Sequence, residues 1–504
     1  MDQHIKQWPA LWALVIGFFM ILVDTTIVSI AYPVLLRELD TDLTTVIWVT
    51  SAYLLAYAVP LLITGRLGDR FGPKRIYLVG LVVFTLASLW CGLSGSIGML
   101  IAARAVQGLG AALMTPQTMA VITRIFPPDK RGAAMGLWGA VAGIATLVGP
   151  VLGGVLVDSA GWQWIFFVNV PIGVIAFVVA WRLVPNLETR VHRFDWLGVA
   201  LSGVGLFLLV FGIQEGETFE WGTIAGPITV WGLIIAGLVV LTAFVVWQRF
   251  NRAEPLLPLG LFLDRNFSLS NAAISLVGIA VTSTPLPLAF FFQIARGLEP
   301  TQAALMLVPT AVVSGILAPL VGRLSDRVNP KWIALSSLIT AALAIAWYAS
   351  LLSLETPLWL LLLPSAVLGV GMAGIWAPLA STVTRNLPTS QAGAGSGVYN
   401  TTRQIGSVLG SAAIAALMNA RLALELPGFD TESAQQAGAD VAGPLPPEVG
   451  DGFAAAMSQS LWLALGAYVI CAVVVLCFAK PKVTVAWGET GAGERTSPLP
   501  ASSK

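Results

Sequence analysis

The 504-residue sequence has little charge: Lys, Arg, Asp and Glu make up only 11% of it, whereas a soluble globular chain carries about a quarter. Apolar residues account for 57%. This composition excludes an ordinary soluble protein and predicts an all-α integral membrane protein, because helices satisfy their backbone hydrogen bonds internally. With a net charge of +1, nothing indicates nucleic-acid binding.

Residues of metal and covalent chemistry are also scarce. Cys91, Cys471 and Cys477 lie inside apolar runs without metal-ligand or disulfide spacing. His4 and His192 lie outside the apolar runs, so no Ser–His or metal-ligand constellation is visible, and we expect neither an enzyme nor a metal site. No Gly-Lys dipeptide occurs, which excludes a P-loop and hence a nucleotide-driven pump.

Long apolar runs are abundant. Fourteen runs, with centres from Phe19 to Val469, approach the roughly 20 residues that cross a bilayer. With the N-terminus placed inside, 22 of the 27 Lys and Arg fall in cytoplasmic loops and tails, two fall inside runs, and three (Arg37, Arg296 and Arg421) fall outside. The positive-inside rule therefore predicts a multi-pass protein of the cytoplasmic (inner) membrane with both termini cytoplasmic.

An internal repeat divides the chain. GRLGDRFGPKR, from Gly65 to Arg75, returns as GRLSDRVNPK from Gly322, and RIFPPDKRGAAMG from Arg124 aligns with RNLPTSQAGAGSG from Arg385 at an offset of 261. We therefore predict six-helix bundles at 1–184 and 268–480. The linker 185–267 adds two spans, at roughly 196–214 and 227–248. A long external loop at 422–452 and a flexible cytoplasmic tail at 481–504 complete the prediction.

The first copy of the repeated motif reads as a tight basic connection between two spans. Its glycines let backbones approach and turn. Asp69 is expected just before the following helix, whose dipole favours a carboxylate. An ordinary charged loop would explain one copy but not its repetition. The gating residues predicted here are Gly65, Asp69, Arg70, Gly72 and Arg75.

Three ionisable residues remain inside the apolar spans: Asp24, Arg104 and Arg403. Each costs at least about 2.5 to 3.5 kcal/mol at mid-bilayer, so such residues pair or line a wet cavity. Asp24 and Arg104 fall at similar depths, and we expect Asp24 to bind the transported proton under the control of Arg104. The alternative is a static pair that fixes span 1 against span 4. For Arg403, a gating or substrate role stands beside simple snorkelling.

The fifth span contains a stripe of glycines around Pro150, which predicts a bend or a sliding contact. Close packing alone is the alternative. The gating residues predicted in this span are Gly149, Pro150, Gly153 and Gly154.

Aromatic and polar side chains within the spans fit a cavity for hydrophobic, often cationic solutes. The predicted substrate-binding residues are Tyr53, Tyr57, Gln107, Trp138, Asn271, Trp376, Tyr399, Asn400 and Gln404.

Over nearly its whole length the chain resembles the major facilitator superfamily, in particular its 14-span drug:proton antiporter branch, the EmrB/QacA-like transporters. GRLGDRFGPKR is similar to the loop 2/3 signature, and VDTTIVSIAYP from Val23 to the span 1 signature that carries Asp24. RAVQGLGAA from Arg104 resembles the span 4 motif whose arginine is implicated in proton transfer, and GPVLGG from Gly149 the antiporter motif. WQWIFFVNVPIG from Trp162 resembles the opening of span 6.

The resemblance implies a major facilitator fold of two six-helix bundles with two extra central helices. It also implies a secondary active transporter that exports hydrophobic, neutral or monocationic drug-like compounds in exchange for protons, by alternating access. Divalent cargo is disfavoured because the C-terminal spans contain no acidic residue. The alternative is an exporter of lipids or cell-envelope precursors on the same scaffold. Protons are the coupling ion, and we expect no cofactor, nucleotide or nucleic acid, with a monomer in the bilayer.

Overall fold

The computed structural model describes residues 6–41, 43–127, 130–187, 189, 195–216, 218–251, 255–385, 387, 391–426 and 447–479. Within these residues the fold is helical apart from one short hairpin, formed by β1 (Thr223–Ala225) and β2 (Ile228–Thr229). The all-α prediction is therefore confirmed. The predicted tail at 481–504 lies outside the described residues.

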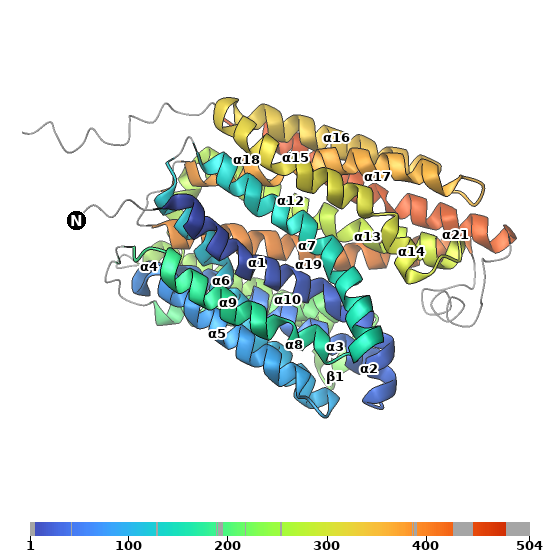
Figure 1. The fold of residues 1–504 in the computed structure, drawn as a ribbon, viewed down its shortest axis with the longest axis horizontal. Helices are drawn as coiled ribbons and strands as arrows, with labels where there is room; N and C mark the ends of the chain where they lie inside the picture. The colour runs from blue at the N-terminus through green and yellow to red at the C-terminus, as the bar shows by residue number, and fades with distance from the viewer. Residues whose placement is uncertain are drawn as a thin grey trace, which may run out of the picture.

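The N-terminal half of the chain forms one group of helices, drawn in blue to teal in Figure 1. They are α1 (Gln7–Ile27), η1 (Val28–Ala31), α2 (Tyr32–Glu38), α3 (Leu43–Ala58), α4 (Leu61–Phe71), α5 (Pro73–Gly92), α6 (Ile97–Ile125), α7 (Arg131–Ala160), α8 (Trp164–Phe167) and α9 (Asn169–Leu183).

The C-terminal half forms a second group, drawn in yellow-green to red in Figure 1. Its members are η2 (Leu259–Leu263), α12 (Arg265–Ser283), α13 (Pro285–Phe290), η3 (Phe291–Ala295), α14 (Pro300–Leu305), α15 (Val308–Arg327), α16 (Pro330–Leu351), α17 (Leu358–Ala373), α18 (Trp376–Arg385), α19 (Ala392–Glu425), α21 (Pro447–Ser460) and α22 (Trp462–Leu476). Since α19 continues to Glu425 and α21 begins at Pro447, helices occupy both ends of the segment predicted as an external loop at 422–452.

Among the described residues, twelve helical segments are long and apolar enough to cross a membrane. The helices α3 and α4 make a thirteenth if they count as one span, bent by 46°. The bend falls at Pro60, whose ring and missing N–H interrupt a helix. The predicted run centred on Ala145 falls in α7, a 30-residue helix with several side chains outside the described part. The total of fourteen spans therefore stays a prediction.

Local sequence explains the turn between α4 and α5. Gly72 has φ +94°, a backbone conformation that residues with a side chain rarely adopt. Pro73 then starts α5, because its fixed φ suits the first helical turn. In the second copy of the motif, the Asn329 side chain accepts a hydrogen bond from the Lys331 amide at the start of α16. Both copies thus connect two helices, as the sequence predicts.

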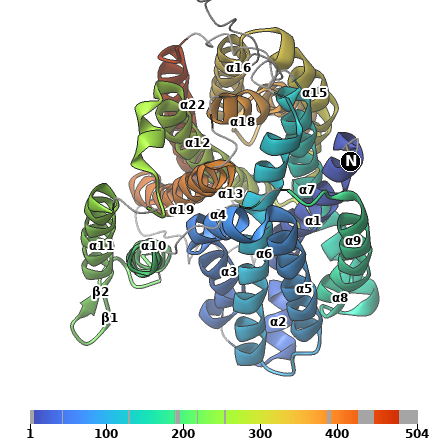
Figure 2. The same cartoon turned by 90° about the vertical axis from the view of Figure 1, so that its left-hand side faces the viewer.

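The remaining helices, α10 (Trp196–Gln214) and α11 (Val230–Phe250), lie beside the two groups (Figure 2). Their apolar cluster includes Leu209 and Ile234, and Val408 of α19 packs against it. On the other side, the Phe211 ring of α10 lies 5.7 Å from the Trp48 ring of α3. The two additional helices therefore contact both halves of the molecule.

Candidate functional site

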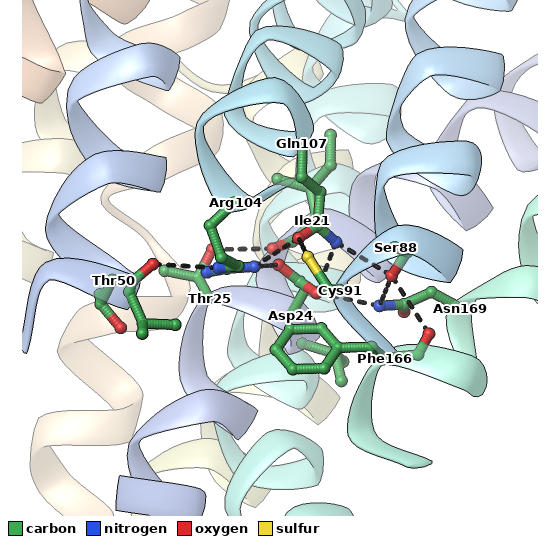
Figure 3. A network of polar contacts seen from close by, with 12 residues as sticks. Ile21, Asp24, Thr25, Thr50, Ser88, Cys91, Arg104, Gln107, Phe166 and Asn169 are labelled. Atoms are coloured by element: carbon green, nitrogen blue, oxygen red, sulfur yellow. Dashed lines mark hydrogen bonds and ion pairs between the residues drawn. The ribbon is translucent and has the colours of Figure 1, made fainter. Parts of the chain in front are cut away.

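The carboxylate of Asp24 lies fully buried on α1, where α1 faces α5, α6 and α9 (Figure 3). Its Oδ2 atom is 2.5 Å from Nη1 of Arg104, which is also fully buried. The structure therefore joins the two charges that the sequence places at similar depths.

Arg104 is held by more than its carboxylate partner. Its Nη1 donates to Oε1 of Gln107 at 2.7 Å, and its Nε donates to the carbonyl of Val49 at 3.2 Å. The Tyr53 ring lies under the guanidinium, 4.1 Å from its carbon. The guanidinium group of Arg104 is thus held between α3 and α6. Its Nη2 atom has no hydrogen-bond partner among the described residues.

Two amide side chains complete the shell around Asp24. Oδ1 accepts hydrogen bonds of 2.9 Å from Nε2 of Gln107 and Nδ2 of Asn169. The same two nitrogens donate to Oγ of Ser88, which donates to the carbonyl of Phe166. Gln107 is predicted to bind substrate, but both its Oε1 and its Nε2 atoms already form hydrogen bonds within this network.

Sequence reasoning missed Asn169 and Ser88. Asn169 stands within WQWIFFVNVPIG, which we had associated only with the opening of a span, and Ser88 is a short polar residue in an apolar run. Their depth relative to Asp24 was the available signal. Ser88 lies about one turn before the end of α5, and Asn169 lies about one turn into the apolar segment Trp164–Leu183, close to the level of Arg104.

This arrangement is costly to disturb and can respond to a proton. Removing one partner of a buried ion pair leaves an uncompensated charge, at a cost of about 3 to 5 kcal/mol. Protonation of Asp24 would cancel its charge and weaken its hold on Arg104 and on the two amides. The site can therefore couple proton binding to the packing of α1 against α5, α6 and α9.

A second set of polar contacts joins the two halves of the chain. Asp69 pairs with Arg124 at 2.5 Å, and its carboxylate accepts hydrogen bonds of 2.9 Å from the amides of Gly393 and Ala394, at the start of α19. This corrects our expectation for Asp69. It lies in the last turns of α4 and binds the N-terminus of a distant helix, because the motif continues the helix up to Phe71.

The repeated motif makes the corresponding contact. Asp326, near the end of α15, accepts from the amides of Gly132 and Ala133 at 2.7 and 2.9 Å, at the start of α7. Each half thus supplies a carboxylate to the positive end of a long helix from the other half. We call the two contacts the α4–α19 seam and the α7–α15 seam.

Glycines allow the backbones to touch along both seams. A Cβ on Gly136 would lie 2.8 Å from the Ala318 carbonyl oxygen and from Cα of Gly322, and one on Gly65 would overlap the Gly393 carbonyl. Contacts so close exclude any side chain.

The glycines of the antiporter motif, which begins at Gly149, differ in how closely their neighbours pack. A Cβ on Gly149 would collide with Thr26 of α1, whereas one on Gly154 would meet nothing within 4 Å. Gly153 is buried. Pro150 lies within α7, but its side chain is outside the described part. Close packing therefore explains Gly149 and does not explain Gly154. Among the other predicted gating residues, Arg70 lies over the Phe71 ring and Arg75 is exposed.

Several predicted substrate residues lie where the two halves meet. Tyr57 donates to Thr115 at 3.2 Å and accepts from Nη2 of Arg403, on α19, at 3.5 Å. Trp138, by contrast, stacks on Phe18 of its own half, with the ring centroids 4.5 Å apart.

Other members of the set are distributed more widely. A Cβ on Gly139, next to Trp138, would lie 3.3 Å from Cβ of Trp376 in the other half. Asn271 bonds within its own half, to Phe267 and Thr402. Tyr399, Asn400 and Gln404 are buried on α19. The set therefore includes both contact-face residues and residues of the C-terminal interior.

A repeated bundle of membrane-crossing helices, with a fully buried carboxylate–guanidinium pair in the N-terminal half, is typical of a secondary membrane transporter. The chain belongs to the Major Facilitator Superfamily, whose family model matches residues 14–411. It is therefore a multi-pass membrane transporter and not an enzyme.

Individual relatives agree with this assignment. An uncharacterized MFS-type transporter of Mycobacterium tuberculosis is 53% identical over 91% of this chain and 78% of its own length. The tetracenomycin C resistance and export protein of Streptomyces glaucescens is 33% identical over 83% and 77%. Among solved structures, the human organic anion transporter MFSD10 has a TM-score of 0.62, covers 92% of this chain and 99% of its own, and is 13% identical. This last likeness confirms the fold alone.

Proposed function

We propose that the protein is a proton-driven exporter of hydrophobic, drug-like compounds, a member of the 14-span drug:proton antiporter branch. The observation that carries the proposal is the Asp24–Arg104 pair, a buried carboxylate with no exposed surface, bound by three donor side chains from two helices, α6 and α9. Structural stability alone gives little reason for such a pair, since apolar packing of equal volume is often as stable.

The exchange follows from the charge of this site. Ionised Asp24 holds α1 against α6 through Arg104 and against α9 through Asn169. A proton that enters from the outer side binds the carboxylate, cancels the pair and frees α1 to move. Release of that proton to the inner side restores the pair. One proton thus crosses for each complete cycle of this site.

Alternating access requires that the two seams open. Both are closed in this structure at the end where α7 and α19 begin, since Asp69 and Asp326 bind these helix starts. The positive-inside distribution makes this the cytoplasmic end, so the arrangement is one that excludes cytoplasmic cargo. A transport cycle would break both carboxylate–helix contacts together.

The cargo class rests on the contact face and on a relative. Tyr57 and Trp376 give aromatic surface where the halves meet, and Arg403 is the cation beside Tyr57. A cation at this face disfavours multiply charged cationic cargo. The related Streptomyces protein is a resistance and export protein for tetracenomycin C. We therefore infer neutral or monocationic hydrophobic compounds as substrates.

The decisive experiment uses purified protein in proteoliposomes with an imposed pH gradient and a panel of fluorescent lipophilic compounds. Wild-type protein should move a compound against its gradient, and Asp24→Asn should reduce this proton-driven transport at least tenfold while folding and compound binding persist. Asp451→Asn, which removes an exposed carboxylate at α21, is the matched control.

Two results would count against the proposal. Unchanged coupling in Asp24→Asn removes the proton role of this site. Loss of a surface lipid in a deletion strain that keeps its drug resistance favours an exporter of lipids or envelope precursors.

A further inference from the structure

A small pocket lies among helix ends of the C-terminal half, away from the Asp24 site. Its walls come from the starts of α12 and α16 and the ends of α18 and α22, and they include Asn266, Lys331, Thr382, Arg385 and Phe478. Because Arg131 at the start of α7 donates to the Thr384 carbonyl, the pocket lies at the same end of the molecule as the two seams.

Part of the polar lining is already engaged. Lys331 donates through Nζ to the carbonyls of Leu476 and Phe478, at 2.7 and 3.4 Å, and so holds the end of α22. Asn266 exchanges two hydrogen bonds with the backbone of Ala479. Arg385 differs, because its Nε atom is buried and has no hydrogen-bond partner among the described residues.

The internal repeat shows what Arg385 lacks. It aligns with Arg124, which forms an ion pair with Asp69. The counterpart of Asp69 is Asp326, whose carboxylate binds the amides of Gly132 and Ala133. No ion pair between Asp326 and Arg385 occurs in the described part of the chain. Among the described residues, the C-terminal half thus keeps both the cation and the carboxylate but does not pair them with each other.

The chemistry of the pocket selects an anion of limited size. Two cationic side chains and no carboxylate are among its lining residues. The pocket is partly open, and its cavity volume of about 10 Å³ is close to the space of one water-sized group, so only the tip of a ligand fits inside it. A phosphate oxygen has the size and the negative charge that fit this pocket, and a guanidinium group can bind a phosphate through two parallel hydrogen bonds.

The surroundings indicate where the phosphate comes from. Beside the pocket, Trp332 is 57% exposed with Lys331 over its ring, and Leu476 on α22 is 48% exposed. Tryptophan and lysine at helix ends mark the bilayer interface, and apolar side chains below them face acyl chains. We propose that this pocket binds the phosphate of an anionic phospholipid, through Arg385 and Lys331, with the acyl chains along α16 and α22. This site is independent of the proton coupling at Asp24.

The test measures lipid binding to the purified full-length protein by native mass spectrometry, with phosphatidylglycerol as the probe. Arg385→Gln should weaken binding of the first phosphatidylglycerol at least tenfold. Arg323→Gln removes an exposed arginine from α15, outside the pocket, and should leave binding within twofold. Equal losses in both variants would overturn the proposal, because general attraction to the basic end would then explain the binding.

Two further measurements distinguish the source of the phosphate and allow for a variant that does not fold. Inorganic phosphate at millimolar concentration should not displace the lipid; if it does, the site takes a soluble anion and the lipid assignment is wrong. The emission of Trp332 is obtained by subtracting the fluorescence of Trp332→Phe from that of the wild-type protein. Brominated phosphatidylglycerol should quench this emission more than brominated phosphatidylcholine does. Equal quenching by the two lipids would also overturn the proposal.

Discussion

At the residue scale, the donors around Asp24 differ in what their loss would do. Arg104 contributes charge and a fixed fork, whereas Gln107 and Asn169 contribute neutral hydrogen bonds to Oδ1. Hydrogen bonds to an ionised carboxylate favour that form over the protonated one. The amides therefore hold the carboxylate by neutral hydrogen bonds, while Arg104 supplies the charge that balances it.

Asn169→Leu tests this division of roles. A hydrogen bond to a charged group contributes about 1.5 kcal/mol, so loss of this donor should lower the initial rate of proton-driven transport about tenfold. The measurement is the initial transport rate in proteoliposomes under a fixed pH gradient. Ser88→Ala, which removes a partner of the amides without touching Asp24, should lower the rate less. A wild-type rate in Asn169→Leu would show that the site does not need this donor.

At the element scale, the helices α7 and α19 carry out matching tasks. Each begins at a carboxylate supplied by the other half, and each touches a helix of that half through glycines. Two similar seams at one end can open together as one rigid movement, because neither contains an interlocking side chain at the closest approach.

Gly136→Ala should loosen the α7–α15 seam. Its Cβ would lie 2.8 Å from two backbone atoms, Ala318 O and Gly322 Cα, so the helices must separate, at about 1 to 3 kcal/mol. Amide exchange measured by mass spectrometry at the start of α7, where Gly132 and Ala133 donate to Asp326, should become faster. Gly154→Ala, with open space around its Cβ, is the control in the same helix. Equal exchange in wild type and Gly136→Ala would show that the seam tolerates the methyl group.

At the scale of the whole molecule, one polar cluster joins α10 and α11 to each other and to the N-terminal half. Asp195, before α10, accepts hydrogen bonds from Trp247 and Gln248 at the end of α11 and from the Leu256 amide in the following linker. Arg66 of α4 donates to the carbonyls of Pro255 and Leu256. The cluster thus links the additional helices to the N-terminal half just before the chain enters the C-terminal half.

Acid should weaken this cluster. Burial by itself raises the pKa of Asp195, but the hydrogen bonds from Trp247, Gly198, Gln248 and Leu256 bring it below the usual 3.8. A carboxyl group whose pKa is lowered by folding stabilises the folded state at pH values above its unfolded-state pKa. This contribution is lost as the pH falls through the folded-state pKa. Asp195→Asn should therefore lower Tm at pH 7 and show less further loss between pH 5 and 3 than wild type. Identical acid curves for wild type and variant would contradict this, and Asp451→Asn again serves as control.

Periodicity and charge in the sequence were sufficient to predict the helices, the internal repeat and the presence of charges inside the membrane. These properties depend on single segments, because a span needs only length and hydrophobicity and a buried charge is visible against its apolar neighbours. The motif around Gly72 was likewise readable as a turn, since glycine and proline restrict the local backbone.

Only the tertiary structure revealed which groups meet. Asp69 and Asp326 each bind the first amides of a helix in the other half, and Asn169 and Ser88 join Asp24 from separate helices. Backbone amides have no signature in sequence, and the rotation of one helix against another is fixed by the packing of many side chains at once. The sequence by itself thus determined which segments cross the membrane and which charges they carry, and the packing of those segments decided the partner of each charge.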